Sequence, residues 1–203
     1  MDEAGLHAVI AERLEGCDRL IVAIAGAPGA GKSTLAERLR EEIEARGESV
    51  AVVPMDGFHF DDRVLVARGL LARKGAPETF DVAGFRHLLR RLRAREPDVA
   101  IPIFDRAIEI SRAGAAIVPA DTRVILTEGN YLLLDEAPWD GLAGVFDLTI
   151  WLDVPVDELE RRLVRRWLDH GFALEQAREK ALANDIPNAR RAAAGSRPAD
   201  ISL

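Results

Sequence analysis

The stretch Gly26-Ala27-Pro28-Gly29-Ala30-Gly31-Lys32-Ser33 decides the fold of this chain. It matches the pattern G-x-x-x-x-G-K-[ST] at every position. The glycines of such a loop allow positive φ angles, and successive backbone N–H groups surround an anion at the start of the following helix. The lysine reaches the β- and γ-phosphates, and the serine hydroxyl faces Mg²⁺. We therefore expect a magnesium–nucleoside triphosphate, ATP in the simplest case, to bind residues Gly26, Ala27, Pro28, Gly29, Ala30, Gly31, Lys32, Ser33 and Thr34.

The segments on either side of this loop have the pattern that it requires. Leu20–Ala25 is a continuous apolar run, as expected of a strand buried on both faces of a parallel sheet. An amphipathic helix is expected over Lys32–Arg46, and Ser49–Val53 is predicted to be a second strand. This strand–loop–helix–strand order predicts an α/β fold with a parallel sheet. The alternative, a chance glycine-rich turn, is disfavoured by this context.

The rest of the chain shows no internal repeat, no low-complexity tract and no long linker. Periodicity predicts further helices over 2–16, 61–72, 81–95, 156–170 and 174–193. Apolar runs predict strands over 123–127, 148–152 and 199–203, with 99–104 either a strand or an irregular extended piece. We expect a single domain over residues 1–203, with about five parallel strands flanked by helices.

Composition and charge exclude several classes of protein. The 27 Lys and Arg against 34 Asp and Glu give a net charge of −7, which argues against a broad nucleic-acid surface. Cys17 is the only cysteine, and Met1–Ala4 lacks a signal-peptide pattern, so the cytoplasm is the expected location. The longest apolar run is too short to span a membrane. The oligomeric state stays open, and a homo-oligomer is one alternative.

Several classes of protein have such a loop, and three motifs that this sequence lacks favour a small kinase over the others. The sequence has no Asn/Thr-Lys-x-Asp motif for guanine, no transporter signature rich in Ser and Gly, and no second phosphate loop. A kinase needs a base on the acceptor side. Asp56 follows the second expected strand, at the sheet edge where ligands bind, and its carboxylate is placed to accept the proton of an attacking hydroxyl. The alternative is a turn-forming Asp before Gly57.

Three further segments carry a resemblance to a known family. They are Met55-Asp56-Gly57-Phe58-His59, Arg73-Lys74-Gly75-Ala76-Pro77-Glu78-Thr79-Phe80-Asp81 and Thr127-Glu128-Gly129. With the phosphate loop, their order and spacing resemble the family of phosphoribulokinase, uridine kinase and bacterial pantothenate kinase. The resemblance implies a P-loop kinase fold that uses ATP and Mg²⁺, with Lys32 and Asp56 catalytic and with Ser33 and Glu128 at the metal. Glu128 as a solvated glutamate at a strand end is the alternative.

The resemblance also implies an acceptor site. Asp81 matches the family's acidic residue that holds substrate hydroxyls, although its position also suits a helix N-cap. His59 either hydrogen-bonds the acceptor or packs between Phe58 and Phe60. Both are expected to be substrate-binding residues.

The segment Pro102–Arg106 occupies the place of a family segment that contacts the substrate. Phe104 replaces the family's tyrosine, and Arg106 adds a charge that suits an anionic or hydroxyl-rich acceptor. The alternative for Arg106 is a surface ion pair with Glu109 or Asp105.

Residues 159–166 resemble the lid helix of these kinases, and we expect a small lid over about 156–175. Lid arginines stabilise charge on the transferring phosphoryl group. Arg162 and Arg166 flank the apolar face of this helix, one turn apart. Glu158 is a ready i,i+4 partner for Arg162. Arg166 has no such partner, and it is our first choice for the catalytic lid arginine.

The resemblance to uridine kinases ends after the lid helix. Leu168-Asp169 stands where they have Arg-Asp, and Glu109 stands where they have a histidine. Both differences argue against pyrimidine-nucleoside specificity. The segment Asn184-Asp185-Ile186-Pro187-Asn188 is more similar to a bacterial subgroup named for fructose transport. We therefore expect transfer of the γ-phosphate to a hydroxyl of a sugar, nucleoside or related metabolite. A uridine-like or pantothenate-like kinase, a non-catalytic nucleotide-binding regulator and a GTPase switch are the alternatives.

Overall fold

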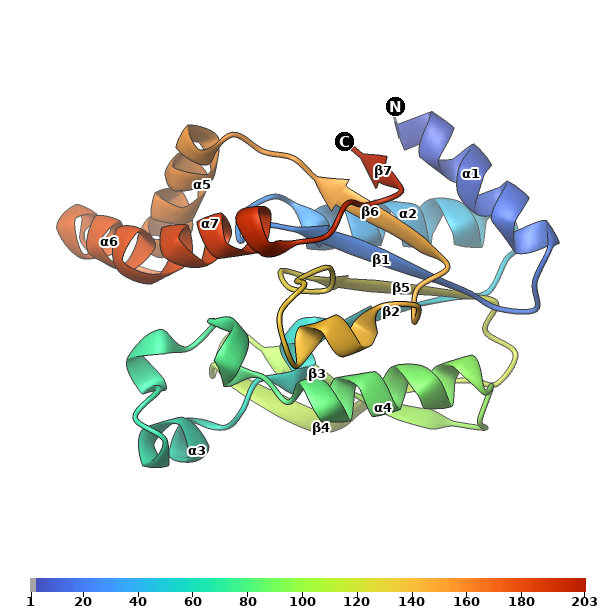
Figure 1. Ribbon diagram of the computed structural model, residues 1–203, viewed down its shortest axis with the longest axis horizontal. Helices are drawn as coiled ribbons and strands as arrows, with labels where there is room; N and C mark the ends of the chain where they lie inside the picture. Colours follow the sequence, from blue (N-terminus) through green and yellow to red (C-terminus); the bar gives the residue numbers. More distant parts are fainter. Residues whose placement is uncertain (1–2) are drawn as a thin grey trace.

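The computed structural model describes residues 3–203, and its centre is a five-stranded sheet (Figure 1). The strand order is β2-β5-β1-β6-β7, and each neighbouring pair is parallel. The α/β class, the parallel sheet and its five strands are therefore confirmed. The strands are β1 (Leu20–Gly26), β2 (Val50–Pro54), β5 (Val124–Gly129), β6 (Leu148–Leu152) and β7 (Ile201–Ser202).

Strand β1 is the middle strand of the sheet, and each of its two faces packs into a hydrophobic core. Ile21 and Ala23 pack into one core, whereas Val22 and Ile24 pack into the other. The two-residue period of a strand thus turns one continuous apolar run into two buried faces. The second core is covered by α1 and α2, and the first by α4. These helices are α1 (Glu3–Glu15), α2 (Lys32–Ala45) and α4 (Val82–Arg93).

A separate antiparallel hairpin lies beside α4 (Figure 1). Strand β3 (Val99–Asp105) pairs with β4 (Ile110–Val118). The extended piece expected at 99–104 is a strand, but the sequence did not predict β4. Most of β4 is exposed, so it lacks the apolar alternation that marks a half-buried strand. The base of the hairpin is buried in the first core through Val99, Ile101 and Val118.

Two expected helices differ in the structure. The prediction over 61–72 is wrong in extent, because α3 (Asp62–Ala67) ends before Gly69, whose φ of 69° is left-handed. The expected helix over 174–193 is interrupted by a π-helical turn, because Pro187 has no backbone N–H to continue the helical hydrogen bonds. Its parts are α6 (Leu174–Lys180), the turn Ala181–Asp185 and α7 (Ile186–Gly195).

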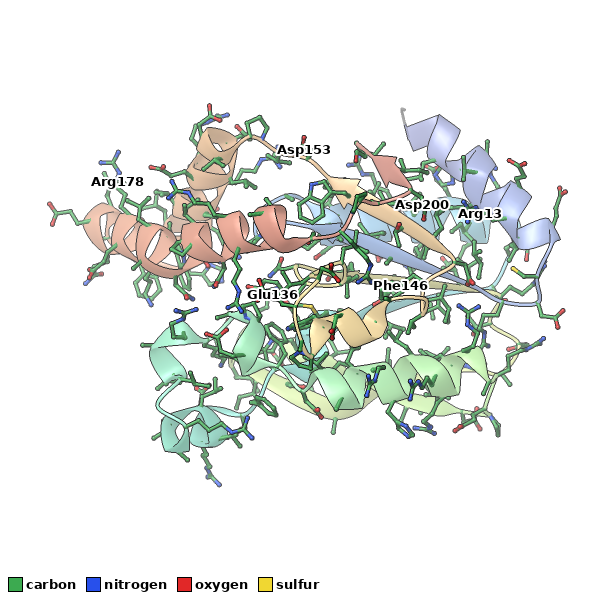
Figure 2. The ribbon with its side chains drawn as sticks, viewed as in Figure 1. Arg13, Glu136, Phe146, Asp153, Arg178 and Asp200 are labelled. Carbon is green, nitrogen blue, oxygen red and sulfur yellow. The ribbon has the colours of Figure 1, made fainter. Side chains whose placement is uncertain are left out.

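The helix expected over 2–16 and the strand expected over 199–203 are both present, as α1 and β7. Helix α1 begins at Glu3, and Asp2 lies outside the described residues. At the other end, Asp200 fixes β7 against β6, since its carboxylate accepts hydrogen bonds from the Thr149 N–H at 2.8 Å and the Thr149 hydroxyl at 2.7 Å (Figure 2). Among residues 3–203 no helix is long and apolar enough to cross a bilayer.

The expected helix at 156–170 is present as α5 (Val156–Asp169). Figure 1 shows α5, α6 and α7 at the end of the molecule where β6 points, with α3 at the same end on the opposite side. The carboxyl edge of the sheet therefore lies at the end of the molecule that carries elements from both halves of the sequence (Figure 1).

Candidate active site

The phosphate loop leaves β1 at Gly26 and enters α2 at Lys32. Gly29 and Gly31 have φ angles of 81° and 98°, a region that L side chains rarely adopt, so these positions require glycine. A Cβ atom on Gly29 would lie 3.2 Å from Cγ of Leu163, so the loop packs directly against α5. These backbone angles at the start of α2 suit a nest of N–H groups for an anion.

Lys32 is buried, and its ammonium group is held by two oxygen atoms. Nζ donates to the Ala27 carbonyl at 2.9 Å and to Oδ1 of Asn130 at 2.6 Å. Burial lowers the pKa of Lys32, while the charges of Glu128 and Asp56 raise it. A bound polyphosphate would be expected either to take the place of these two oxygen atoms around the ammonium group or to interact with it in addition to them. Sequence reasoning missed Asn130, although it directly follows Glu128-Gly129 at a strand end.

Glu128 ends β5 next to the first turn of α2. Its Oε1 accepts a hydrogen bond from the Ser33 hydroxyl at 3.1 Å. Burial raises the pKa of Glu128, and the nearby Asp56 charge raises it further, whereas Lys32 and the Ser33 hydroxyl lower it. A buried carboxylate beside a serine hydroxyl is a set of oxygen ligands that suits Mg²⁺ or its bound waters. The alternative of a solvated Glu128 is wrong, because the residue is only 7% exposed.

Asp56 lies in a 3-10 turn (Met55–Phe58) directly after β2, and the hairpin packs on this turn. A Cβ on Gly57 would overlap the Pro102 carbonyl, and the Ser111 hydroxyl donates to the Gly57 carbonyl. This close approach brings Arg106 to Asp56, with 2.7 Å between Nη2 and Oδ2. The expected alternative of a pair between Arg106 and Glu109 or Asp105 is therefore wrong.

His59 and Phe104 form one aromatic wall on the acceptor side. The His59 ring centroid lies 4.0 Å from that of Phe80 and 4.8 Å from that of Phe104. The expected packing between Phe58 and Phe60 is thus wrong. Burial lowers the pKa of His59, although the neighbouring Asp56 acts in the opposite direction. Its Nδ1 lies 2.8 Å from the Asp56 carbonyl oxygen.

Asp81 is the N-cap of α4. Its Oδ1 accepts a hydrogen bond from the Gly84 N–H at 2.9 Å, and its own N–H donates to the Phe58 carbonyl at 2.8 Å. The capping alternative is therefore confirmed, and the bond to Phe58 also ties α4 to the turn that holds Asp56. A role for Asp81 in acceptor binding stays a prediction.

The two lid arginines occupy different surroundings. Arg162 donates from Nη1 to the carbonyls of Gly29 and Ala30, both at 3.3 Å, and from Nε to Glu158 at 2.5 Å. The i,i+4 pair is thus confirmed, and Arg162 also reaches the phosphate loop. Arg166 is paired with Asp185 of the π-helical turn, with 3.1 Å between Nη2 and Oδ2, so its partner lies outside its own helix. Helical spacing cannot reveal a partner on another helix.

A cavity of about 520 Å³ lies on the face of α5 that carries these arginines. It is open to solvent and is lined by Glu158, Arg161, Arg162, Arg165, Arg166, Asp169 and His170. A strongly basic surface next to the phosphate loop suits the polyphosphate of a nucleotide.

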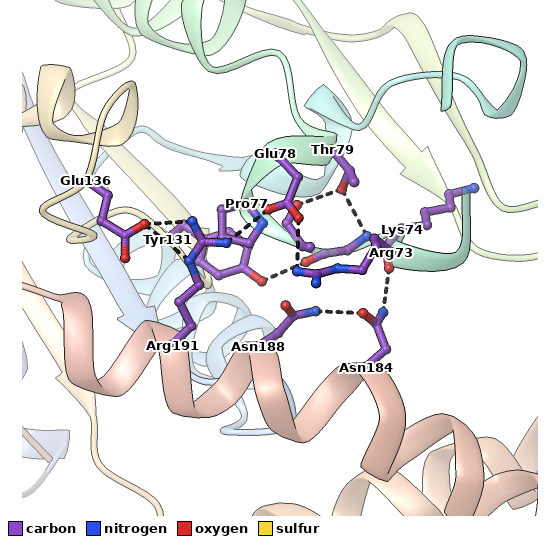
Figure 3. Close-up of polar contacts among 12 residues, drawn as sticks. Arg73, Lys74, Pro77, Glu78, Thr79, Tyr131, Glu136, Asn184, Asn188 and Arg191 are labelled. Atoms are coloured by element: carbon purple, nitrogen blue, oxygen red, sulfur yellow. Dashed lines mark hydrogen bonds and ion pairs between the residues drawn. The ribbon is translucent and has the colours of Figure 1, made fainter. Parts of the chain in front are cut away.

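The acceptor side is joined to α7 by a polar network (Figure 3). The Tyr131 hydroxyl donates to the Gly75 carbonyl at 2.7 Å. Arg191 pairs with Glu136 at 2.6 Å and with Glu78 at 3.0 Å, and Arg73 pairs with Glu78 at 2.9 Å. The loop Arg73–Thr79 is thereby fixed from both α7 and the segment after β5.

Comparison with known proteins assigns this arrangement to a family. The family model for phosphoribulokinase and uridine kinase matches residues 21–191. The chain belongs to this family. As a member of the phosphoribulokinase/uridine kinase family it is a P-loop kinase of small molecules, with ATP as the phosphate donor.

Relatives within the family support this assignment. The chain is 36% identical over 186 residues to the uncharacterized protein YggC of Escherichia coli (strain K12), covering 90% of this chain and 76% of YggC. It is 33% identical over 186 residues to the "putative uridine kinase C227.14" of Schizosaccharomyces pombe, covering 87% of this chain and 79% of that protein. A crystal structure described as a "putative fructose transport system kinase" from Silicibacter sp. TM1040 has 48% identity and a TM-score of 0.95, covering 100% of this chain and 99% of that one.

Proposed function

We propose that this protein transfers the γ-phosphate of ATP to a hydroxyl group of a small polar metabolite, with Asp56 as the base. The observation that supports this most is the placement of Asp56, which follows the end of β2 by two residues, where Pro54 pairs with Glu128 of β5. Its charge also acts on the pKa of both Lys32 and Glu128. Asp56 therefore lies within electrostatic reach of the phosphate site. A carboxylate at that place is suited to orient a hydroxyl for in-line attack on the γ-phosphate.

The phosphate side of the proposed site has one role for each residue. The loop amides and Lys32 bind the phosphates, and the lid arginines Arg162 and Arg166 stabilise charge on the transferring group. Ser33 and Glu128 hold Mg²⁺ directly or through its waters, and Mg²⁺ supplies neutralisation of phosphate charge when bound. Asn130 keeps the Lys32 ammonium near the loop until a nucleotide binds.

The acceptor side favours a hydroxyl-bearing molecule that also interacts with a cation. Arg106 is 57% exposed and shares Oδ2 of Asp56, so an acceptor that reaches Asp56 meets the guanidinium as well. The ring of Phe104 lies 5.8 Å from this guanidinium and closes one side. A sugar is the first acceptor to test, because the relative at 48% identity carries a fructose transport name. Nucleosides and pantothenate come next.

The test measures ADP release with ATP and Mg²⁺ over a panel of sugars, sugar phosphates, hydroxy acids, nucleosides and pantothenate. We expect one class to raise ADP release well above the acceptor-free rate. The variant Asp56→Asn should lower transfer to that acceptor about 10²- to 10⁴-fold, while the exposed Asp140→Asn leaves it unchanged. Transfer by Asp56→Asn at the wild-type rate would show that Asp56 is not the base. ATP binding without stimulation by any acceptor would instead favour a nucleotide-binding regulator.

A further inference from the structure

The turn Ala181–Asp185 is a π-helical turn between α6 and α7. Such turns contain an extra residue relative to an α-helix, and they recur at functional sites. Two polar residues stand next to each other here, Asn184 and Asp185. Their side chains contact different parts of the molecule, one on each side of the proposed site.

Asp185 fixes the lid arginine. The residue is 8% exposed, and its Oδ2 accepts from Nε1 of Trp167 at 2.7 Å and from Nη2 of Arg166 at 3.1 Å. The Arg166 guanidinium also lies 5.3 Å from the Trp167 ring. A buried carboxylate with two donors and an aromatic neighbour leaves the arginine few alternative rotamers.

The fixed guanidinium lines the same open cavity on α5 as Arg162, which donates to the Gly29 and Ala30 carbonyls of the phosphate loop. Burial lowers the pKa of Lys32, and the positive charge of Arg166 contributes to this decrease. Arg166 and Lys32 therefore repel each other, and a bound polyphosphate that interacts with both would relieve that repulsion.

Asn184 contacts the acceptor side instead. Its Nδ2 donates to the Lys74 carbonyl at 2.8 Å, and its Oδ1 accepts from Nδ2 of the buried Asn188 at 3.3 Å (Figure 3). The Lys74 ammonium in turn donates to the Glu109 carbonyl at 2.7 Å, at the tip of the hairpin that carries Arg106. The turn thus supports the loop and, through it, the hairpin.

We infer that the Asn184–Asp185 turn is a positioning element for phosphoryl transfer, in which Asp185 orients Arg166 toward the γ-phosphate and Asn184 holds the acceptor loop. This inference rests on the proposed function. It assigns a role to two residues that contact neither nucleotide nor acceptor in the proposed site, and it predicts separate effects for each of them.

The first test is Asp185→Asn, which keeps the shape of the side chain and removes its charge. We measure the affinity for Mg²⁺–ATP and for Mg²⁺–ADP by titration calorimetry, because this readout needs no acceptor. Loss of one oriented arginine should weaken ATP binding about tenfold, with ADP changed less than about twofold. The matched control is Asp18→Asn, which breaks the exposed Arg95–Asp18 pair of 3.6 Å just before the amino end of β1, outside the proposed site, and should leave both affinities unchanged.

A double-mutant cycle tests whether Asp185 affects ATP affinity through Arg166. If Asp185 acts through Arg166, then Asp185→Asn should have almost no further effect in an Arg166→Ala background. Equal loss of ATP and ADP affinity, or losses that multiply in the double variant, would overturn the inference. Trp167→Phe removes the other donor to Asp185 and should lower ATP affinity about threefold, which supplies the comparison if thermal denaturation shows Asp185→Asn to be unfolded.

The second test uses whichever acceptor the panel identifies. Asn184→Ala should raise the acceptor KM about tenfold with kcat nearly unchanged, whereas Asp185→Asn should lower kcat about tenfold with the acceptor KM nearly unchanged. The same change in both parameters for both variants would indicate a structural role only and would overturn the inference. Failure of the wild type to bind ATP is a different result, since it rejects the proposed function itself.

Discussion

The donor and acceptor halves of the candidate site are built in opposite ways. The core of the donor half comes from one continuous stretch, residues 26–33, together with the end of β5, and only the lid arginines of α5 are added from elsewhere in the proposed site. Its Lys32 and Glu128 are each 7% exposed. The acceptor half is assembled from the Asp56 turn, the loop Arg73–Thr79 and the β3–β4 hairpin. Its side chains are more exposed, with Asp56 at 22% and Arg106 at 57%.

This difference follows from what each half has to recognise. Phosphate is the same in every reaction, and backbone N–H groups at a helix start suffice to bind it. The names of the relatives point to different acceptors, and in the proposed site side chains on separate segments recognise the acceptor. Substitutions in the donor half should therefore affect all acceptors equally, whereas those in the acceptor half should change selectivity.

The largest expected effect is that of Lys32→Met. Removal of the buried ammonium should lower kcat/KM about 10³-fold for every acceptor, because in the proposed site Lys32 neutralises charge that develops on the transferring phosphate. Steady-state kinetics with two unrelated acceptors provide the measurement. Arg40→Met is the control and should leave kcat/KM unchanged, because Arg40 pairs with Glu37 and Glu44 of its own helix α2, outside the proposed site. A decrease in kcat/KM for only one of the two acceptors would show that Lys32 also contributes to acceptor selectivity, and the division into two halves would be wrong.

The next effect is that of Arg106→Gln. It should raise the acceptor KM about 10- to 100-fold, as expected for a lost charged hydrogen bond, while the KM for ATP stays the same. Arg112→Gln on the same hairpin is a suitable control, since Arg112 pairs only with Asp105 among the contacts described for it and is 64% exposed. An equal change in both KM values would place Arg106 in the donor half.

A smaller kinetic effect, with an opposite effect on stability, is expected for Glu128→Gln. Activity should fall about tenfold if, as proposed, Glu128 is a metal ligand, because the side chain loses its charge. Burial raises the pKa of Glu128, so ionisation is less favourable in the folded than in the unfolded state. The wild type therefore loses stability as the pH rises from the ordinary carboxyl range through the raised pKa, and the uncharged amide of the variant escapes this loss.

Thermal denaturation from pH 4 to pH 8 checks this prediction. The variant should melt a few degrees above the wild type at neutral pH, and the difference should vanish at acidic pH, where the wild-type carboxyl is protonated in both the folded and the unfolded state. A variant less stable than the wild type at pH 8 would mean that the attraction between Glu128 and Lys32 exceeds the cost of burial.

The smallest effect is expected for Tyr131→Phe. It removes the hydroxyl that donates to the Gly75 carbonyl, at a cost of about 1 kcal/mol in the free energy of unfolding. A looser acceptor loop should raise the acceptor KM only a few-fold and leave ATP binding unchanged. Denaturant titration and acceptor kinetics on the same preparation measure both quantities. Weakened ATP binding would show that this loop also supports the donor half.

Most of the fold and the donor half could be predicted because their signals are local. The apolar run of β1, the glycines of the loop and the following amphipathic helix lie within one short segment. The alternation of β1 between two cores is a direct result of strand geometry. Lys32, Ser33 and Glu128 meet because β1 and β5 are parallel neighbours, with Ile24 opposite Glu128.

The acceptor half and the lid contacts could not be predicted in the same way. Arg106 meets Asp56 across 50 residues, and Arg166 meets Asp185 on another helix. Helix spacing reports only partners on the same helix, so it made Arg166 look unpaired. Strand β4 is mostly exposed and gave no apolar pattern. These contacts depend on how the hairpin and α7 dock, which no short sequence window contains.

The antiparallel hairpin is paired only with itself, apart from the main sheet. Its tip can therefore change in length or sequence without breaking any hydrogen bond of the five parallel strands. An insertion between Asp105 and Ile110 would alter what stands opposite Asp56 and leave the phosphate loop intact. In evolutionary terms, the hairpin is an exchangeable part through which one ancestral ATP-using scaffold could acquire new substrates, and it is the natural place to graft sequence when redesigning this enzyme.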